Sequence, residues 1–308
     1  MTHPKSRPIQ GLWPALLMPM NASGHMDLPR AIAHGKRLLA SGSDGLTLFG
    51  TTGEGTAFTV AQRKALVEAF AAAGVPGSQL IVNLTALALD DAVELGHHAM
   101  AHQVAGTMLM PPFYFNAPRD AGIVESVSYV VRAINNPNIR LLLYHFPSLC
   151  NVAFSHDTIR ELARRHPGQV VGVKDSSGDL PHSLGLAKAF PELCIMVGSE
   201  PDVAPTMLAG GTGSVNGMAN LAPRLMRRVI DRPADVSAAD KALMMGLLGL
   251  LSVRPNMPFV SAYKTAMAEQ TGDDAWLHVC PPLSPLDNTE AQAVREAYRA
   301  LNIDPATV

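Results

Sequence analysis

Residues 170–179 read VVGVKDSSGD, an apolar and β-branched run that ends on a lysine and is followed by small and acidic residues. Segments of the same kind recur along the chain, with longer amphipathic segments between them. This alternation predicts parallel strands joined by crossover helices. The candidate strands are 12–18, 44–49, 80–85, 106–111, 140–146, 170–175, 194–198 and 213–218. Eight strands predict an α/β fold, a closed (β/α)8 TIM barrel.

Helix-start signals lie between the predicted strands. Thr59 precedes Gln62 by three residues, which is a capping-box spacing. Asp27 stands before Pro29 at a second expected helix start. These signals support helices as the connections between strands.

The strand pattern stops after Pro223. We expect a catalytic barrel over residues 1–223, and the last barrel helix with a C-terminal helical extension over 224–308. Helical stretches are predicted there at 237–252, 258–271 and 287–302, the first and last of them capped by Ser237 and Asp287.

The composition favours a small-molecule enzyme. The 308 residues are 47% hydrophobic, which is enough to bury a large core. A net charge of -2 favours neither nucleic acid nor a membrane surface as a partner. Three scattered cysteines without a CxxC pair indicate a reducing, cytoplasmic location. The N-terminus lacks the roughly 20 apolar residues of a membrane span, and we interpret it as the first strand, not a signal peptide.

Lys174 is the first candidate for chemistry. In a barrel of this kind the active site lies at the carboxyl ends of the strands, where Lys174 ends its apolar run. Loss of hydration favours the neutral amine, which can attack a ketone, so Lys174 is a candidate Schiff-base lysine. The alternative is a lysine at a strand end that pairs with Asp175 or Asp179.

Two further strand ends carry candidates. The second strand leads into GTTGE, residues 50–54, where Thr51 and Thr52 with glycine-freed N–H groups could hold a carboxylate. An ordinary strand-to-helix turn is the alternative. The fifth strand, in RLLLYHFPS, delivers Tyr144, whose phenol could shuttle a proton near an imine. A half-buried core tyrosine is the alternative there.

GTTGE, YHFPS and GVKDSSGD, in this order on strands two, five and six, resemble the dihydrodipicolinate synthase and N-acetylneuraminate lyase family. The resemblance extends over nearly the whole chain. It implies a class I aldolase barrel that acts on pyruvate or releases it, without a metal or an organic cofactor. It also implies a homotetramer built as a dimer of dimers.

The same resemblance implies roles for individual residues. Lys174 matches the Schiff-base lysine, and Tyr144 matches the tyrosine that relays protons. Thr51 and Thr52 match the threonines that bind the pyruvate carboxylate and continue the relay. Tyr114, in PPFYFN, matches the tyrosine that the neighbouring subunit lends to the relay.

Leu149 departs from part of the family. True dihydrodipicolinate synthases carry an arginine at this position, within the segment that here reads PSLC, to bind the carboxylate of aspartate semialdehyde. Leucine cannot form that ion pair, which disfavours lysine biosynthesis and favours a neuraminate-like or 2-keto-3-deoxy sugar-acid substrate. NLTA at 83–86 replaces the frequent GTGA segment of the family.

Residues near the strand ends are expected to contact the rest of the substrate. For Glu200, a carboxylate placed at a helix N-terminus is the alternative. The substrate-binding set comprises Thr52, Gly53, Leu149, Gly198, Glu200, Ser214, Val215 and Asn216.

Three other signals are interpreted as structural. Gly210 and Gly211 precede strand eight, so they would lie at the bottom of the barrel, away from any phosphate. His98 and His102 have the spacing of a metal pair, but with no third ligand near them in the sequence they indicate, together with His97, a solvated helix face. Lys264 is expected to be a surface lysine.

The functional hypothesis is cleavage of a 2-oxo acid, held as an imine on Lys174, to pyruvate and an aldehyde, or the reverse condensation. The imine replaces a Lewis acid, so no metal is required. The alternatives are dehydration of a 2-keto-3-deoxy sugar acid, 4-hydroxy-tetrahydrodipicolinate synthesis, and a barrel that binds 2-oxo acids without turnover.

Overall fold

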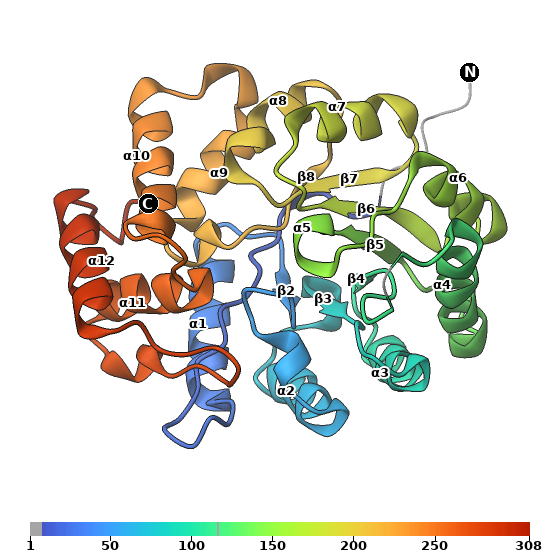
Figure 1. Ribbon diagram of the computed structural model, residues 1–308, viewed down its shortest axis with the longest axis horizontal. Coiled ribbons are helices and arrows are strands. Elements are labelled where there is room, and N and C mark those ends of the chain that lie inside the picture. The colour runs from blue at the N-terminus through green and yellow to red at the C-terminus, as the bar shows by residue number, and fades with distance from the viewer. Residues whose placement is uncertain (1–7, 116) are drawn as a thin grey trace.

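Eight parallel strands form the centre of the molecule, and helices surround them (Figure 1). The computed structural model describes residues 8–115 and 117–308. The strands are hydrogen-bonded in the order β1-β8-β7-β6-β5-β4-β3-β2. Their bounds are β1 Gly11–Leu12, β2 Leu46–Leu48, β3 Leu80–Asn83, β4 Gly106–Leu109, β5 Leu141–His145, β6 Val170–Asp175, β7 Cys194–Val197 and β8 Gly213–Ser214.

The sheet curls until its two edges meet. Thr47 on β2 donates its backbone N–H to Pro14 O at 2.8 Å, and Leu16 N donates to Thr47 O at 2.9 Å. Residues 14–16 follow β1, so these bonds connect the first and last strands of the order. The predicted arrangement of eight parallel strands within a ring of helices is confirmed.

The first and eighth strands have shorter regular ladders than predicted. Pro14 has no N–H to donate, which interrupts the ladder of β1. Backbone bonds nevertheless continue the pairing, from Trp13 N to Ser214 O and from Ala15 N to Asn216 O, both at 2.9 Å.

The helices form where capping signals predict them. Thr59 and Gln62 make a full capping box, and the Asp27 side chain accepts from Arg30 N. Ser237 and Asp287 cap the helices expected after them. The α-helices are α1 Leu28–Ala40, α2 Val60–Ala72, α3 Leu89–Ala101, α4 Asp120–Ile134, α5 Pro147–Cys150, α6 His156–Arg165, α7 Leu180–Ala189, α8 Val203–Leu208, α9 Pro223–Asp231, α10 Ala238–Gly249, α11 Phe259–Thr271 and α12 Asn288–Ala300.

The C-terminal helices share a buried core with the strands near β1 and β7. Leu12 and Val197 of the strands belong to one apolar cluster with Met267 of α11 and Val294 of α12. Trp276, between these two helices, belongs to the same cluster. Helices α10 to α12 lie together on one side of the molecule (Figure 1). Within the described ranges, none of the helices is both long enough and apolar enough to span a bilayer.

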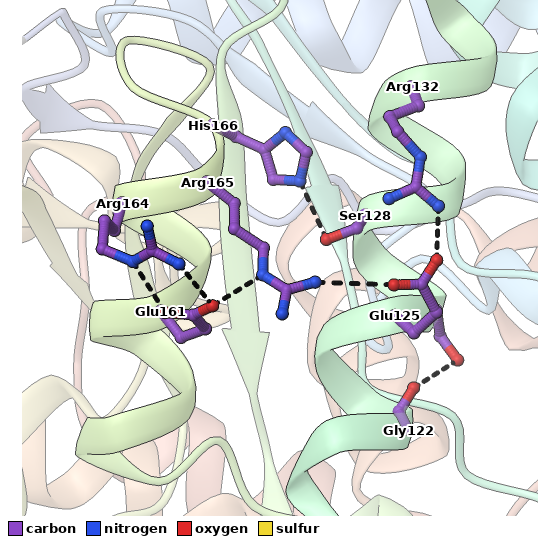
Figure 2. A network of polar contacts seen from close by, with 9 residues as sticks. Gly122, Glu125, Ser128, Arg132, Glu161, Arg164, Arg165 and His166 are labelled. Atoms are coloured by element: carbon purple, nitrogen blue, oxygen red, sulfur yellow. Dashed lines mark hydrogen bonds and ion pairs between the residues drawn. The ribbon is translucent and has the colours of Figure 1, made fainter.

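A polar network joins helices α4 and α6 (Figure 2). Arg165 lies 2.7 Å from Glu161 on its own helix and 3.5 Å from Glu125 on α4. His166 Nε2 lies 2.8 Å from Ser128 Oγ, in a buried contact. Solvent screens the exposed ion pairs, so their net contribution to stability is small.

A buried histidine makes stability depend on pH. Burial, with the charge of Arg37, lowers the pKa of His34 from 6.5 to about 3, although a hydrogen bond to Asn220 opposes this. Below pH 6.5 the unfolded chain gains a proton that folded His34 does not, so stability falls as pH falls.

Lowering the pH from 7 to 5 should reduce the free energy of unfolding by about 2 kcal/mol through His34 alone. His34→Gln keeps a donor for Asn220 Oδ1 and removes the titration. Urea unfolding at both pH values should therefore show a smaller loss for this variant than for the wild type. Equal losses would contradict the assignment.

Candidate active site

Lys174 projects from β6 into the interior of the curled sheet. Its Cα is in register with Tyr144 on β5 and Met196 on β7. Side chains alternate along a strand, so Lys174 and Tyr144 share one face while Asp175 points to the other. Lys174 is 3% exposed, and its Nζ lies 4.0 Å from the centroid of the Tyr144 ring.

The two acidic neighbours that could pair with Lys174 are engaged elsewhere. Asp175 accepts from Ser183 Oγ at 2.7 Å and lies 3.0 Å from His182 Nδ1. Burial pushes the pKa of Asp175 up, but these hydrogen bonds outweigh it and hold the pKa at about 2. Asp179 caps α7. The interpretation of Lys174 as an ordinary strand-end partner of these carboxylates is therefore not supported.

The GTTGE loop brings a hydroxyl to Tyr144. Thr51 Oγ1 lies 3.0 Å from the Tyr144 hydroxyl. The loop can fold this tightly because glycine is present where a side chain would collide: a Cβ on Gly53 would lie 2.5 Å from Leu16 O, and one on Gly55 would lie 1.9 Å from Phe49 O. The sequence therefore positions a lysine, a phenol and a hydroxyl in one cluster.

The NLTA segment, residues 83–86, supports this loop. Phe49, just before GTTGE, has a φ of 64°, which is uncommon for a residue other than glycine. Asn83 Nδ2 donates to Phe49 O at 2.8 Å, and Thr85 Oγ1 donates to Asn83 Oδ1 at 2.7 Å. The Arg63 guanidinium lies 5.0 Å from the centroid of the Phe49 ring. The departure from GTGA thus supplies side chains that hold the turn.

Glu54, the last residue of GTTGE, is paired with a buried lysine. Lys264 Nζ lies 2.5 Å from Glu54 Oε1, and both side chains are almost fully buried. Lys264 also donates to His278 O at 2.6 Å, and Glu54 Oε2 accepts from Cys280 N at 2.8 Å. The prediction of a surface lysine is wrong, because residues 260–268 of α11 are all buried.

A cavity of about 170 Å³ opens beside these groups. Eight residues predicted from the sequence line it: Thr51, Thr52, Tyr144, Lys174, Gly198, Glu200, Val215 and Asn216. The sequence analysis missed Ala15, Phe146, Ser176, Gly178, Ser199, Gly217, Leu251, Phe259 and Tyr263. The cavity can therefore present an amine, a proton relay and several polar groups to one small molecule.

Glu200 and Tyr263 form a buried polar pair at the cavity wall. Glu200 Oε1 accepts from Met218 N at 3.0 Å and hydrogen-bonds Tyr263. Burial raises the pKa of Glu200, and burial together with the neighbouring carboxyl raises the pKa of Tyr263. Tyr263 lies on α11, far beyond the last strand in sequence, so the strand-end rule could not identify it.

Comparison with known proteins identifies the family. A family model described as the dihydrodipicolinate synthetase family matches residues 8–301. The chain belongs to this family. Members of the dihydrodipicolinate synthetase family are lyases and aldolases, which agrees with the buried lysine, phenol and hydroxyl at the cavity.

Individual relatives within the dihydrodipicolinate synthetase family are distant. An uncharacterized DapA-like lyase of Chloroflexus aurantiacus is 31% identical over 298 residues, which cover 95% of this chain and 97% of the relative. The crystal structure of dihydrodipicolinate synthase from Agrobacterium tumefaciens is 31% identical, with a TM-score of 0.88 over 95% of this chain and 99% of that one. A Ruminococcus gnavus sialic acid aldolase is 21% identical, with a TM-score of 0.86 over 97% of this chain and 98% of that one, and shows the shared fold.

Four residues predicted for the site lie outside the described lining of the cavity in this family member. Leu149, on α5, is 49% exposed. Ser214 is buried, donates to Val197 O at 2.7 Å and accepts from Asn216 Nδ2 at 2.7 Å, so it positions Asn216 instead. Gly53 allows the tight fold of the GTTGE loop. Tyr114 is the fourth.

Tyr114 lies on a second hollow of about 180 Å³ above β4. The phenol ring is 73% exposed, and neighbouring Phe115 is 74% exposed. Leu87, at the same hollow, is 68% exposed. Three large exposed apolar side chains on one surface are typical of a contact with another protein chain.

Proposed function

We propose that the chain is a class I aldolase that binds a 2-oxo acid as an imine on Lys174 and cleaves it to pyruvate and an aldehyde. The observation that carries the proposal is the cluster at the cavity: the Lys174 amine lies over the Tyr144 ring, and the Tyr144 hydroxyl is 3.0 Å from Thr51. A buried amine, a phenol and a hydroxyl in this order suit imine formation with proton transfer.

The reaction divides between these groups. The Lys174 amine adds to the substrate ketone, and loss of water gives the imine. The bond between C3 and C4 then breaks, its electron pair moving into the protonated imine, while Tyr144 accepts the proton of the C4 hydroxyl. Thr51 passes that proton towards Tyr114 of a neighbouring subunit, and Thr52 holds the substrate carboxylate. The enamine that remains takes up a proton at C3, and water then hydrolyses the imine to release pyruvate and the Lys174 amine. The chemistry requires neither a metal nor an organic cofactor, because the imine is the electron sink.

A polyhydroxylated substrate tail is supported by the polar wall of the cavity. The buried Glu200–Tyr263 pair and Asn216 offer donors and acceptors for hydroxyl groups. Leu149 offers no cation for a second carboxylate. We therefore propose a 2-keto-3-deoxy sugar acid or a related compound as the substrate. Dehydration of the same imine is a second outcome, which analysis of the products distinguishes from cleavage.

A second candidate is 4-hydroxy-tetrahydrodipicolinate synthase. The 31% identity to the Agrobacterium tumefaciens dihydrodipicolinate synthase favours it. Leu149 opposes it, and aspartate semialdehyde would need another carboxylate anchor. A barrel that binds 2-oxo acids without turnover would need a broken relay, whereas Lys174, Tyr144 and Thr51 are all in place.

The proposed assembly is a cytoplasmic homotetramer, a dimer of dimers, with pyruvate or a similar 2-oxo acid as its ligand and with neither nucleic acid nor membrane as a partner. The exposed Tyr114 surface supports the dimer contact, because a neighbouring subunit would bury the apolar ring of Tyr114 while leaving its hydroxyl free to hydrogen-bond. Each cavity would then receive Tyr114 from the other subunit.

Trapping with pyruvate tests the proposed chemistry. Borohydride added with pyruvate should reduce the imine to a stable adduct, which intact mass would detect and peptide mapping would assign to Lys174. A folded protein without an adduct, or an adduct on another lysine, would contradict the proposal. Pyruvate release from 2-keto-3-deoxy sugar acids, measured beside condensation of pyruvate with aspartate semialdehyde, separates the two candidate functions.

A further inference from the structure

Two neighbouring helices on the outside of the barrel bring a carboxylate and two imidazoles together. Glu68 lies on α2, and His98 lies on α3 one turn before His102, the residue at which α3 ends. His98 Nε2 is 3.0 Å from Glu68 Oε1, and the two imidazole centroids are 4.5 Å apart. The sequence offers no third ligand near this histidine pair, but the fold brings Glu68 to it from another helix.

We propose that Glu68, His98 and His102 form a binding site for a transition-metal dication of the Zn²⁺ type, separate from the catalytic cavity. One ligand atom from each residue lies within 4.8 Å of the other two. A tetrahedral ion with bonds of about 2.0–2.2 Å holds its ligand atoms about 3.4 Å apart. Side-chain rotation can provide the adjustment, since none of the three residues is buried. The fourth position remains for water.

The ligand types and the local charge favour a transition metal. Imidazole nitrogen suits Zn²⁺, whereas Mg²⁺ prefers oxygen alone. Glu68 contributes a negative charge, and the C-terminal end of the α3 dipole adds a negative potential beside His102. Lys64, one turn before Glu68, is 3.0 Å from Glu94, one turn before His98, so this ion pair offsets the nearby ammonium charge.

A second group of possible ligands, His145, Asp175 and His182, is already engaged in hydrogen bonds of the protein. Asp175 Oδ2 already accepts from Ser183 and contacts His182. His145 Nδ1 accepts from Phe154 N at 3.2 Å, so its other nitrogen carries the proton. This group is a hydrogen-bonded support behind β5 and β6, unlike the Glu68 site.

The proposed metal site is distant from the chemistry. In a barrel the helices run antiparallel to the strands, so the C-terminal end of α3 lies at the opposite end from the catalytic cavity. Helices α2 and α3 lie next to each other in Figure 1 and are in contact. A bound ion would connect these two helices, and its presence or absence leaves the proposed imine chemistry unchanged.

Zn²⁺ titration of the untagged full chain tests the site. Equilibrium dialysis should detect a Zn²⁺ site that His98→Ala and His102→Ala each weaken by at least about tenfold, because even loss of an outer-shell partner costs that much. Glu68→Gln should weaken it too, since it removes the anion. His97→Ala is the matched control, because it removes an exposed histidine of the same helix.

A thermal readout separates site loss from misfolding. Zn²⁺ should raise the Tm of the wild type and of His97→Ala, but not that of His98→Ala, while Mg²⁺ should leave all three unchanged. Absence of Zn²⁺ binding to the wild type, or equal binding by the His98→Ala and His97→Ala variants, would overturn the proposal. Aldolase activity and pyruvate trapping are measured separately and depend on Lys174.

Discussion

Lys174→Ala should lower kcat by about four orders of magnitude or more and abolish the borohydride-trapped pyruvate adduct. The reason is that Lys174 is the nucleophile, and loss of a nucleophile removes the covalent route rather than one interaction along it. The Thr51–Tyr144 hydrogen bond does not involve Lys174, so the relay should persist in the variant. Steady-state kinetics and intact mass measure the two effects.

Lys188→Ala is the matched control for this prediction. Lys188 is exposed near the end of α7, the helix that follows β6. Its removal should leave both kcat and the adduct unchanged. Turnover by Lys174→Ala within about tenfold of the wild type would mean that another group forms the imine, or that the reaction proceeds without one.

The residues of the proposed relay could be predicted because they obey a local rule. Lys174 and Tyr144 end apolar strands, and parallel strands deliver their carboxyl ends to one place. The register of β5 and β6 then aligns the two residues. Thr51 follows from the same rule and from the glycines beside it. A short strand and its exit turn therefore place Lys174, Tyr144 and Thr51, whereas Tyr114 lies outside the cavity lining of this chain.

Other residues of the site depend on contacts between distant parts of the chain. Tyr263 reaches the cavity because α11 belongs to the apolar cluster that contains Leu12 of β1 and Val197 of β7, and residues 260–268 are all buried. Such a helix has no polar stripe from which its orientation could be read. Glu68 and His98 are likewise brought together by the packing of α2 on α3. Ser214 is a different case. It lies on the predicted strand, but its hydroxyl donates to Val197 O of the neighbouring strand and does not face the cavity.

The buried pair between Glu54 and Lys264 gives the second large effect. Lys264→Met should lower the free energy of unfolding by about 3–5 kcal/mol, because it leaves the Glu54 carboxylate buried without its cation. Glu54 ends the loop that carries Thr51 and Thr52, so the same variant should weaken pyruvate binding. Urea unfolding and the pyruvate concentration needed for half-maximal trapping provide the two measurements.

Two further variants distinguish loss of the ion pair from loss of packing. Combining Lys264→Met with Glu54→Gln removes both charges, so the double variant should regain much of the lost stability. Lys241→Met, at an exposed position of α10, should leave stability close to that of the wild type. If the double variant loses as much free energy of unfolding as the two single variants lose together, the stability comes from the packing of these side chains and not from their charges. If the double variant recovers both stability and pyruvate affinity, the ion pair between Glu54 and Lys264 positions α11 against the loop that carries Thr51 and Thr52.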